Sequence, residues 1–353
     1  MTRFGKDNLQ NIKDIFEEKT GTVLEQAPSR RPVGRVLLVA AILAALLSLT
    51  CVAAAELDIG TLFGQIFRGQ QGAPLSGGQS EYIDSHVAAI GESLTREGVT
   101  VTVKGAISDG TTAYLLLDIT AREDMQIGML PLAFNVTLEG LRAEGQAEIH
   151  ISGISNGCQV LPDDDGQENT TTMLIQYNVY QMPGSHFTLN DGQVRTLRLK
   201  DLFYHEAAYP YTKRTVAEGE WVFSVAFTAV DDRETELLAV PMTASYTQIS
   251  GQEVQATIHS FRMKGLSGTF YYTLAPDAVQ EAGDFGVLRF VMQDGSTVRA
   301  YPQKAGQTAQ IADGSLLPGT TCHYCTYVFE APVQREKISA LYLGETAVDI
   351  SVP

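Results

Sequence analysis

Two runs and the turn between them decide the fold class: Val99-Thr-Val-Thr-Val103, Ser108-Asp-Gly110 and Ala113-Tyr-Leu-Leu-Leu-Asp-Ile-Thr120. In the first run valine and threonine alternate, so an extended chain places all three valines on one face. Ser, Asp and Gly are turn formers, and the second run is apolar enough for a strand buried on both faces. The stretch therefore predicts an antiparallel hairpin within a β-sheet.

Runs of the same kind continue to the C-terminus. The further predicted strands are Ala133–Leu138, Ala147–Ile151, Thr172–Tyr180, Val194–Leu199, Trp221–Val230, Val254–Met263, Gly268–Leu274, Gly286–Gln293, Thr297–Tyr301, Cys322–Phe329 and Ile338–Val352. Short strands separated by Gly, Pro and Asp turns are typical of β-sandwiches. One series ends near Val240-Pro-Met242. We therefore expect a mainly β chain with two immunoglobulin-like antiparallel β-sandwiches, at residues 95–240 and 244–353.

An apolar segment precedes the strands. Residues 36–55 contain no charged residue, Gly or Pro. A helix of this length, rising ~1.5 Å per residue, spans about 30 Å, which is the thickness of the hydrocarbon core of a bilayer. Arg30, Arg31 and Arg35 precede the segment, so the positive-inside rule places the N-terminus in the cytoplasm. The prediction is a transmembrane helix in a single-pass protein of the cell membrane, with the C-terminal domains extracellular.

A cleaved signal peptide is the alternative, because Ala53-Ala-Ala55 resembles a small-residue cleavage site. Residues 1–35 are long for the region that precedes the apolar core of a signal peptide. Both alternatives place most of the chain outside the cytoplasm.

The predicted cytoplasmic segment, residues 1–35, contains a short amphipathic helix at about residues 8–19. Its apolar face consists of Leu9, Ile12, Ile15 and Phe16. Such a face either lies on the inner membrane surface or docks into an apolar groove of a cytoplasmic protein. These four residues are the predicted partner-binding residues.

Residues 56–94 are predicted to form juxtamembrane helices and a linker. Leu62, Phe63, Ile66 and Phe67 share one helical face, which either sinks into the outer membrane interface or packs against the first β region. Residues 69–78 are rich in Gly and Gln and are typical of a flexible joint. A second short helix is predicted from Ser80 to about Ile90.

Residue patterns for catalysis or cofactor binding are missing from the sequence. Cys322-His-Tyr-Cys325 is half of a zinc site, but the flanking residues predict a strand, in which positions three apart face opposite ways. Structural or free thiols are favoured there, with a disulfide or a metal as alternatives. Asp163-Asp-Asp-Gly166 lacks the Gly and Glu spacing of an EF-hand loop and predicts a solvated turn. We expect no catalytic residue, no metal site, no cofactor and no enzymatic activity.

The charge is unevenly distributed. Residues 1–35 hold seven Lys and Arg against five Asp and Glu, whereas residues 56–353 hold eighteen against thirty-six. The whole chain has a formal net charge of -16. A surface this acidic repels phosphate backbones, so nucleic acid is not an expected partner.

Several motifs resemble those of a family of uncharacterised Firmicute single-pass membrane proteins. The stretches concerned are Ile12-Lys-Asp-Ile-Phe-Glu-Glu18, Leu57-Asp-Ile-Gly-Thr-Leu-Phe63, Glu92–Val103, Asp294-Gly-Ser296 and Phe329-Glu-Ala-Pro332. The resemblance implies an ectodomain of unknown function with an immunoglobulin-like C-terminal domain, and some such proteins are companions of extracytoplasmic-function sigma factors. One departure is that residues 1–35 are too short for a full anti-sigma domain and lack its His/Cys zinc signature.

Topology and resemblance together predict a membrane-anchored extracytoplasmic sensory or regulatory protein. It would act like an anti-sigma factor, through the helix that carries Leu9, Ile12, Ile15 and Phe16. The alternative is a cell-surface binding or envelope-structural module without a cytoplasmic signalling role. The expected partners are the lipid bilayer, a cytoplasmic sigma factor for the first function, and an extracellular protein or glycan for the second.

Overall fold

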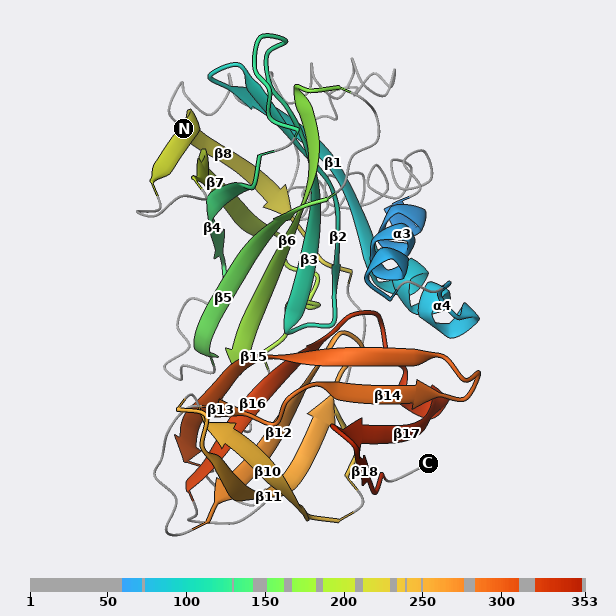
Figure 1. Cartoon of the computed structure of the whole chain (residues 1–353). Coiled ribbons are helices and arrows are strands. Elements are labelled where there is room, and N and C mark those ends of the chain that lie inside the picture. Colours follow the sequence, from blue (N-terminus) through green and yellow to red (C-terminus); the bar gives the residue numbers. More distant parts are fainter. Residues whose placement is uncertain are drawn as a thin grey trace, which may run out of the picture. The chain divides into compact units, whose positions relative to one another are not determined.

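The computed structural model describes most of the chain from residue 59 onward (Figure 1). The described residues are 59–71, 74–128, 130–141, 151–161, 167–181, 187–206, 212–228, 234–238, 240–248, 250–275, 283–310 and 321–350. All of them belong to one compact unit, Leu49–Pro353. The predicted transmembrane segment 36–55 and the predicted partner-binding residues Leu9, Ile12, Ile15 and Phe16 lie outside the described residues. In the described part, none of the helices has the length and apolarity needed to cross a membrane.

The described part is mainly β, and every strand pairing in it is antiparallel, which confirms the predicted class. Its two α-helices are α3 (Ile59–Gln71) and α4 (Gly77–His86). The strands of the first half are β1 (Val87–Arg96), β2 (Val99–Ser108), β3 (Thr112–Thr120), β4 (Leu132–Glu139), β5 (Ile151–Val160), β6 (Thr170–Gln181), β7 (Arg195–His205) and β8 (Lys213–Val225).

The second half begins with the short strand β9 (Thr235–Glu236). The other elements are β10 (Met242–Gln248), β11 (Glu253–Met263), β12 (Ser267–Leu274), β13 (Gly283–Asp284), β14 (Leu288–Met292), β15 (Thr297–Gln310), β16 (Thr321–Phe329), the 3₁₀ turn η1 (Arg335–Lys337), β17 (Ile338–Leu343) and β18 (Thr346–Val348).

The first half is sandwich-like. A five-stranded sheet of order β1-β2-β3-β6-β5 faces a three-stranded sheet of order β4-β7-β8. The alternating valines of β2 and the apolar positions of β3 point into the space between the sheets, where they pack against Trp221 and Phe134, whose rings meet edge to face at 5.6 Å. The predicted hairpin at 99–120 is confirmed, with Val101 opposite Ile119.

The second half is one ten-stranded sheet of order β13-β10-β11-β12-β16-β15-β14-β17-β18, with β9 attached to β11. Strands β11 and β14 are four places apart in this order, which is about 19 Å in a flat sheet. Yet the rings of Phe261 on β11 and Phe290 on β14 lie 6.3 Å apart. The sheet therefore rolls over on itself and encloses its own core. An immunoglobulin-like topology does not follow from this strand order.

The helices pack into the core. Ile59, Phe63 and Phe67 of α3 are buried, and the ring of Phe67 meets that of Tyr114 on β3 at 5.5 Å. Of the two predicted alternatives for this apolar face, packing against the first β region is therefore the one observed, rather than insertion into the outer membrane interface.

The second helix begins earlier and ends earlier than predicted. Ser76 caps α4 in a reciprocal capping box with Gln79, and the helix ends at His86. Residues 87–90, predicted to continue the helix, open strand β1, because they pair with Ala106 and Ile107 of β2.

Candidate functional site

Asp109, at the tip of the β2–β3 hairpin, joins the two halves of the described region. Its side chain is fully buried. Oδ1 accepts hydrogen bonds from the backbone N–H groups of Thr111 and Thr112, at 2.9 and 2.7 Å, which makes the turn. Oδ2 accepts from the N–H of Leu266 at 3.0 Å and from the Ser267 hydroxyl at 2.6 Å. A buried carboxylate needs such partners, and here they come from both halves.

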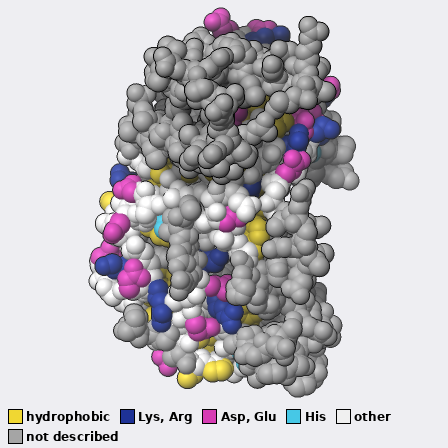
Figure 2. All heavy atoms as spheres, turned by 180° about the vertical axis from the view of Figure 1, so that it is seen from behind, with side chains coloured by type: hydrophobic (Ala, Val, Ile, Leu, Met, Phe, Trp, Pro, Cys, Tyr) yellow, Lys and Arg dark blue, Asp and Glu magenta, His cyan; other side chains and the backbone are white. Residues whose placement is uncertain are grey.

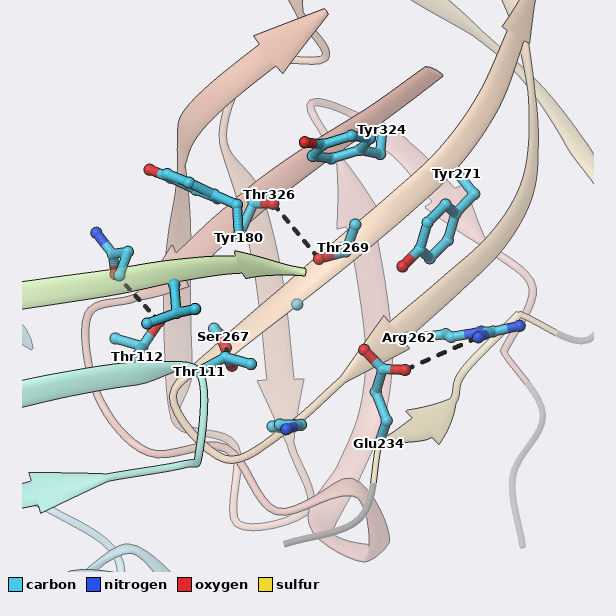
Figure 3. A pocket seen from close by; sticks show the side chains of 14 residues that line it. Thr111, Thr112, Tyr180, Glu234, Arg262, Ser267, Thr269, Tyr271, Tyr324 and Thr326 are labelled. Atoms are coloured by element: carbon cyan, nitrogen blue, oxygen red, sulfur yellow. Dashed lines mark hydrogen bonds and ion pairs between the residues drawn. The ribbon is translucent and has the colours of Figure 1, made fainter. Parts of the chain in front are cut away.

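A hollow lies beside this joint (Figure 3). The space in it that the centre of a water molecule can reach is about 30 Å³, which is room for one or two waters. Most of its side chains are polar. The lining residues are Thr111, Thr112, Asn178, Val179, Tyr180, Glu234, Arg262, Lys264, Ser267, Gly268, Thr269, Tyr271, Tyr324 and Thr326.

The floor of the hollow is the outer face of β11, β12 and β16. Pairing between these strands sets side chains in rows: Arg262 is opposite Thr269, and Thr269 is opposite Thr326. One step along, Tyr271 is opposite Tyr324. The intervening residues Phe270 and Cys325 point into the core. Strand alternation thus produces a polar floor directly above an apolar core.

The wall comes from the first half. Thr112 begins β3 and Thr111 directly precedes it, while Asn178 and Tyr180 lie near the end of β6. The Thr111 hydroxyl lies 3.1 Å from that of Ser267, and Thr112 donates to the Asn178 side chain at 3.1 Å. Two hydrogen-bonded hydroxyls therefore mark the line where wall and floor meet.

The charges of the hollow are unequally paired. An Arg262 nitrogen lies 3.8 Å from a carboxylate oxygen of Glu234 and another lies 3.8 Å from Glu236. These distances exceed those of direct hydrogen bonds, so the guanidinium keeps donors for other groups. Lys264 is half-buried, and no described residue forms an ion pair or hydrogen bond with its ammonium group. Its Nζ lies over Gly110, 3.3 Å from where a Cβ of that residue would be.

Tyr271 and Tyr180 stay neutral. Burial raises the pKa of the Tyr271 phenol far above its usual value, and the nearby charge of Glu234 adds to this. Burial also raises the pKa of Tyr180, whose hydroxyl lies 2.7 Å from that of Ser155. Arg262 stands over the Tyr271 ring, 5.4 Å from its centroid. The lining therefore offers neutral hydroxyls and cationic donors that can hydrogen-bond to water or to a small polar group.

A second depression is acidic. It is lined by Glu97, Lys200, Asp201, Glu218, Gly219 and Glu220. Glu97 and Asp201 adopt the left-handed backbone conformation, with φ of 48° and 52°. Among the described residues, no group of His, Cys, Asp and Glu is arranged to hold a metal ion. Where side chains are visible in Figure 2, acidic and basic groups lie interspersed rather than gathered by sign.

The cysteine motif lies where the sequence places it, on a strand. Cys325 of β16 is fully buried on the core face, against Phe270 of β12 in the ladder. Cys322 is opposite Ala309 of β15. Burial raises the pKa of the Cys158 thiol on β5. The motif Asp163–Gly166 and the predicted partner-binding residues Leu9–Phe16 lie outside the described residues.

Sequence reasoning does not find the hollow. Ser267, Thr269 and Tyr271 alternate with buried residues and read as an ordinary solvent face. The available signal is that a cation, Lys264, and three hydroxyl-bearing residues occupy that face within eight positions.

Comparison with known proteins is sparse. No family model matches the chain, and no curated protein matches it. Among solved structures, the crystal structure of a conserved domain protein from Bacillus anthracis is similar, with a TM-score of 0.42 and 13% identity. That match covers 72% of this chain and 75% of the other.

Proposed function

We propose that the chain is a membrane-anchored sensory or regulatory protein whose β-rich region faces the outside of the cell. One observation carries the proposal: Ile59, buried at the start of α3, follows the apolar segment 36–55 after only three residues. Four steps along an extended chain reach at most about 14 Å. A rearrangement in the β region that moves α3 would therefore act on the membrane helix with little slack.

The cytoplasmic output is the second part of the proposal. The apolar face formed by Leu9, Ile12, Ile15 and Phe16 would contact a cytoplasmic protein, for which a sigma factor is the leading candidate. In that role the chain resembles an anti-sigma factor in effect, although residues 1–35 are shorter than a full anti-sigma domain. The support for this part is the amphipathic pattern together with the charge distribution around the apolar segment.

A cell-surface binding module is the second candidate function, and the sandwich-like first half favours it. Such a module would bind an extracellular protein or glycan without any signal to the cytoplasm. Under either candidate function we propose that residues 95–240 and 244–353 are immunoglobulin-like domains. Such domains commonly serve as binding modules at the cell surface.

The orientation is tested by labelling single cysteines on intact, wall-stripped cells with a membrane-impermeant maleimide. Val194 is 58% exposed, so V194C in a chain whose four native cysteines are Ser should be labelled directly. S29C, in the predicted cytoplasmic segment, is the matched position and should be labelled only after permeabilisation. The reverse pattern, or recovery of the chain in the soluble cytosolic fraction, would refute the proposal.

The cytoplasmic role is tested by crosslinking and purifying the full chain from cells. I12D/F16D should lose a sigma factor that the parent chain retains, because a charge on the apolar face prevents docking in a groove. K13Q, on the opposite face, is the control. Replacing residues 1–35 with an unrelated cytoplasmic segment separates the two candidates: loss of regulation supports the sensory protein, and retained function supports the binding module.

A further inference from the structure

We propose that strand β5 pairs edge to edge with β5 of a second copy of this chain, so that two five-stranded sheets become one continuous antiparallel sheet. Strand β5 is the last strand of its sheet, with β6 on one side only (Figure 1). Such an interface goes beyond both candidate functions, because it involves the β-rich region alone and does not depend on the membrane anchor.

The register of β5 on β6 shows which backbone groups of β5 are unpaired. Val179 of β6 donates its N–H to the Thr111 carbonyl at 2.8 Å, on the side of β6 that faces away from β5. Ile154 is opposite Val179 and therefore directs its own N–H and C=O away from β6. Strand alternation repeats this at every second residue. The four outward residues are Ile154, Asn156, Cys158 and Val160. No described residue hydrogen-bonds to the backbone of these four.

The neighbouring strand β4 leaves this edge open. Only side chains of β5 reach it: Asn156 donates to the Val136 carbonyl at 3.4 Å, and the Cys158 thiol lies 4.0 Å from the Phe134 carbonyl. Side chains stand perpendicular to their sheet, so β4 lies in the opposite layer rather than in the plane of β5. The side chain of Ile154 remains 45% exposed.

The side chains of β5 do not protect the edge. Edge strands usually carry charged residues or proline, which prevent pairing with another chain. Residues 151–161 contain no Asp, Glu, Lys, Arg or Pro. The strands at the other sheet ends of the described region differ, because β1, β4, β8 and β13 each contain a charged residue and β18 lies between Glu345 and Asp349. Strand β5 is therefore suited to accept another strand.

A second copy of the chain is the partner that this edge favours. With a formal net charge of -16, two copies repel each other over most of their surfaces, whereas residues 151–161 form an uncharged strip along which they can approach. Two identical antiparallel strands are related by a two-fold axis. One strip therefore supplies both sides of the contact.

One register pairs all four outward residues with one another. It places Gly157 on the two-fold axis, Ile154 opposite Val160 of the second copy, and Asn156 opposite Cys158 of the second copy. The apolar pair would cover the exposed side chain of Ile154. Facing Cα atoms on the axis would be only ~4.5 Å apart, which glycine accommodates. A Cβ at Gly157 meets nothing within 4 Å in the single chain, so substitutions there spare the fold of the monomer.

The experiment measures the mass of the purified full-length chain in detergent by analytical ultracentrifugation, from about 1 to about 200 µM. We expect a monomer–dimer equilibrium with a Kd of about 10–100 µM, because an edge-to-edge contact is a small interface. G157E should raise this Kd at least about tenfold, since two carboxylates would face each other on the axis. G157K should raise it similarly, because each lysine would also meet its own copy.

Two controls isolate the position from the chemistry. G157A adds a side chain without charge, and V194E adds the same charge at a position that is 58% exposed and outside β5. Both should leave the Kd within about threefold of the parent value. The native fluorescence of Trp221, which is fully buried, shows that each variant is folded.

Two further variants test the backbone contact and the register. I154P removes an N–H that no described residue accepts and blocks the edge with its ring, so the Kd should rise at least about tenfold while pairing with β6 is kept. G157C, in a chain whose four native cysteines are Ser, should form an intermolecular disulfide on oxidation, because residues facing each other across the axis lie within disulfide reach. V194C in the same background should not.

Four results would overturn the proposed interface. The first is a chain that stays monomeric at about 200 µM. The second is a dimer whose Kd is unchanged in G157E and I154P, which would place the contact elsewhere, for example in the apolar segment. The third is a tighter dimer in G157K, because β5 would then meet an acidic surface rather than its own counterpart. The fourth is G157C that crosslinks no more than V194C.

Discussion

Asp109 shows how one side chain can serve two turns. In the sequence it is an ordinary turn former of the hairpin, and its Oδ1 does hold that turn. Its Oδ2 holds a backbone N–H and a hydroxyl more than 150 positions along the chain. The hydrogen bonds within the turn can thus be predicted from the residue type, whereas the bonds to Leu266 and Ser267 depend on the complete fold.

Replacing this carboxylate should be costly. In D109N one acceptor oxygen becomes an NH₂ group that faces donors, which leaves buried N–H groups without partners. We expect the free energy of unfolding to fall by about 2–4 kcal/mol, measured by urea denaturation of the chain in detergent. D294N is the control: Asp294 holds a similar turn through Ser296 but is exposed, so its loss should stay within about 0.5 kcal/mol. Equal losses of unfolding free energy in D109N and D294N would contradict the role of Asp109 in joining the two halves.

His86 should make stability depend on pH. Burial lowers the pKa of its imidazole below 6.5, and Nδ1 donates to the Tyr82 carbonyl at 2.9 Å, since a carbonyl can only accept. As pH falls below 6.5, the unfolded chain binds a proton that the folded chain resists, so the folded state loses stability down to the lowered pKa.

The comparison that isolates this histidine is the parent chain against H86Q between about pH 7.5 and 5.5. The stability difference should shift in favour of H86Q by up to about 1.4 kcal/mol per pH unit. A constant difference over that range would show that His86 does not titrate differently in the two states.

At the scale of elements, periodicity predicts strands well where it is unbroken. The alternating runs of β2, β4 and β6 lie close to their expected bounds. Residues 87–90 at the start of β1 were predicted as helix, and the register of the strand explains why: Ala89 is opposite Gly105, but Glu92 is opposite Val103. One extra residue, next to Gly91 with φ of 68°, forms a bulge that breaks the alternation.

The packing of α3 on the sheet depends on a missing side chain at Gly105 of β2. A Cβ there would lie 2.6 Å from Ile59 Cγ2 and 2.8 Å from the Ala88 carbonyl oxygen. G105A should therefore lower the free energy of unfolding by about 1–3 kcal/mol, because helix and strand must separate. G157A on β5 of the same sheet meets nothing within 4 Å and should change stability by less than about 0.5 kcal/mol. Chemical denaturation measures both variants, and a G105A loss no larger than that of G157A would contradict the close packing of α3 on β2.

Sequence reasoning could not assemble the candidate site for a related reason. Thr269 and Thr326 are neighbours in the floor, yet they lie on strands that meet only because β16 returns beside β12. Each strand alone predicts a polar face, and nothing in either indicates which faces meet. The wall residues belong to another sheet, and their approach depends on Asp109. The hollow is therefore a product of strand order rather than of a local motif.

At the scale of the whole described region, one apolar core crosses between the halves. Phe63 of α3, Tyr114 and Leu116 of β3, and Phe261 and Leu341 of the second sheet belong to the same cluster of buried residues. The α4 helix adds a hydrogen bond from the Gln79 side chain to the Pro332 carbonyl at 3.1 Å. Such continuity indicates that the halves stabilise each other.

That coupling can be measured with the only tryptophan, Trp221, which lies in the separate core of the first half. L341A removes a fully buried side chain from the second half and should cost about 2–5 kcal/mol. If the halves unfold together, the denaturant midpoint reported by Trp221 fluorescence falls in L341A. V287A, at an exposed position of the second half, should leave the midpoint unchanged. An unchanged midpoint in L341A would mean that the halves unfold independently.

The three residues between position 55 and Ile59 have one more effect in the membrane-anchored arrangement. A protease that docks its target as an extended strand needs several accessible residues, more than Glu56, Leu57 and Asp58 supply. Cutting there requires that Ile59 and Phe63 first leave their buried positions, so the rate of shedding from the cell surface would report the local opening of α3.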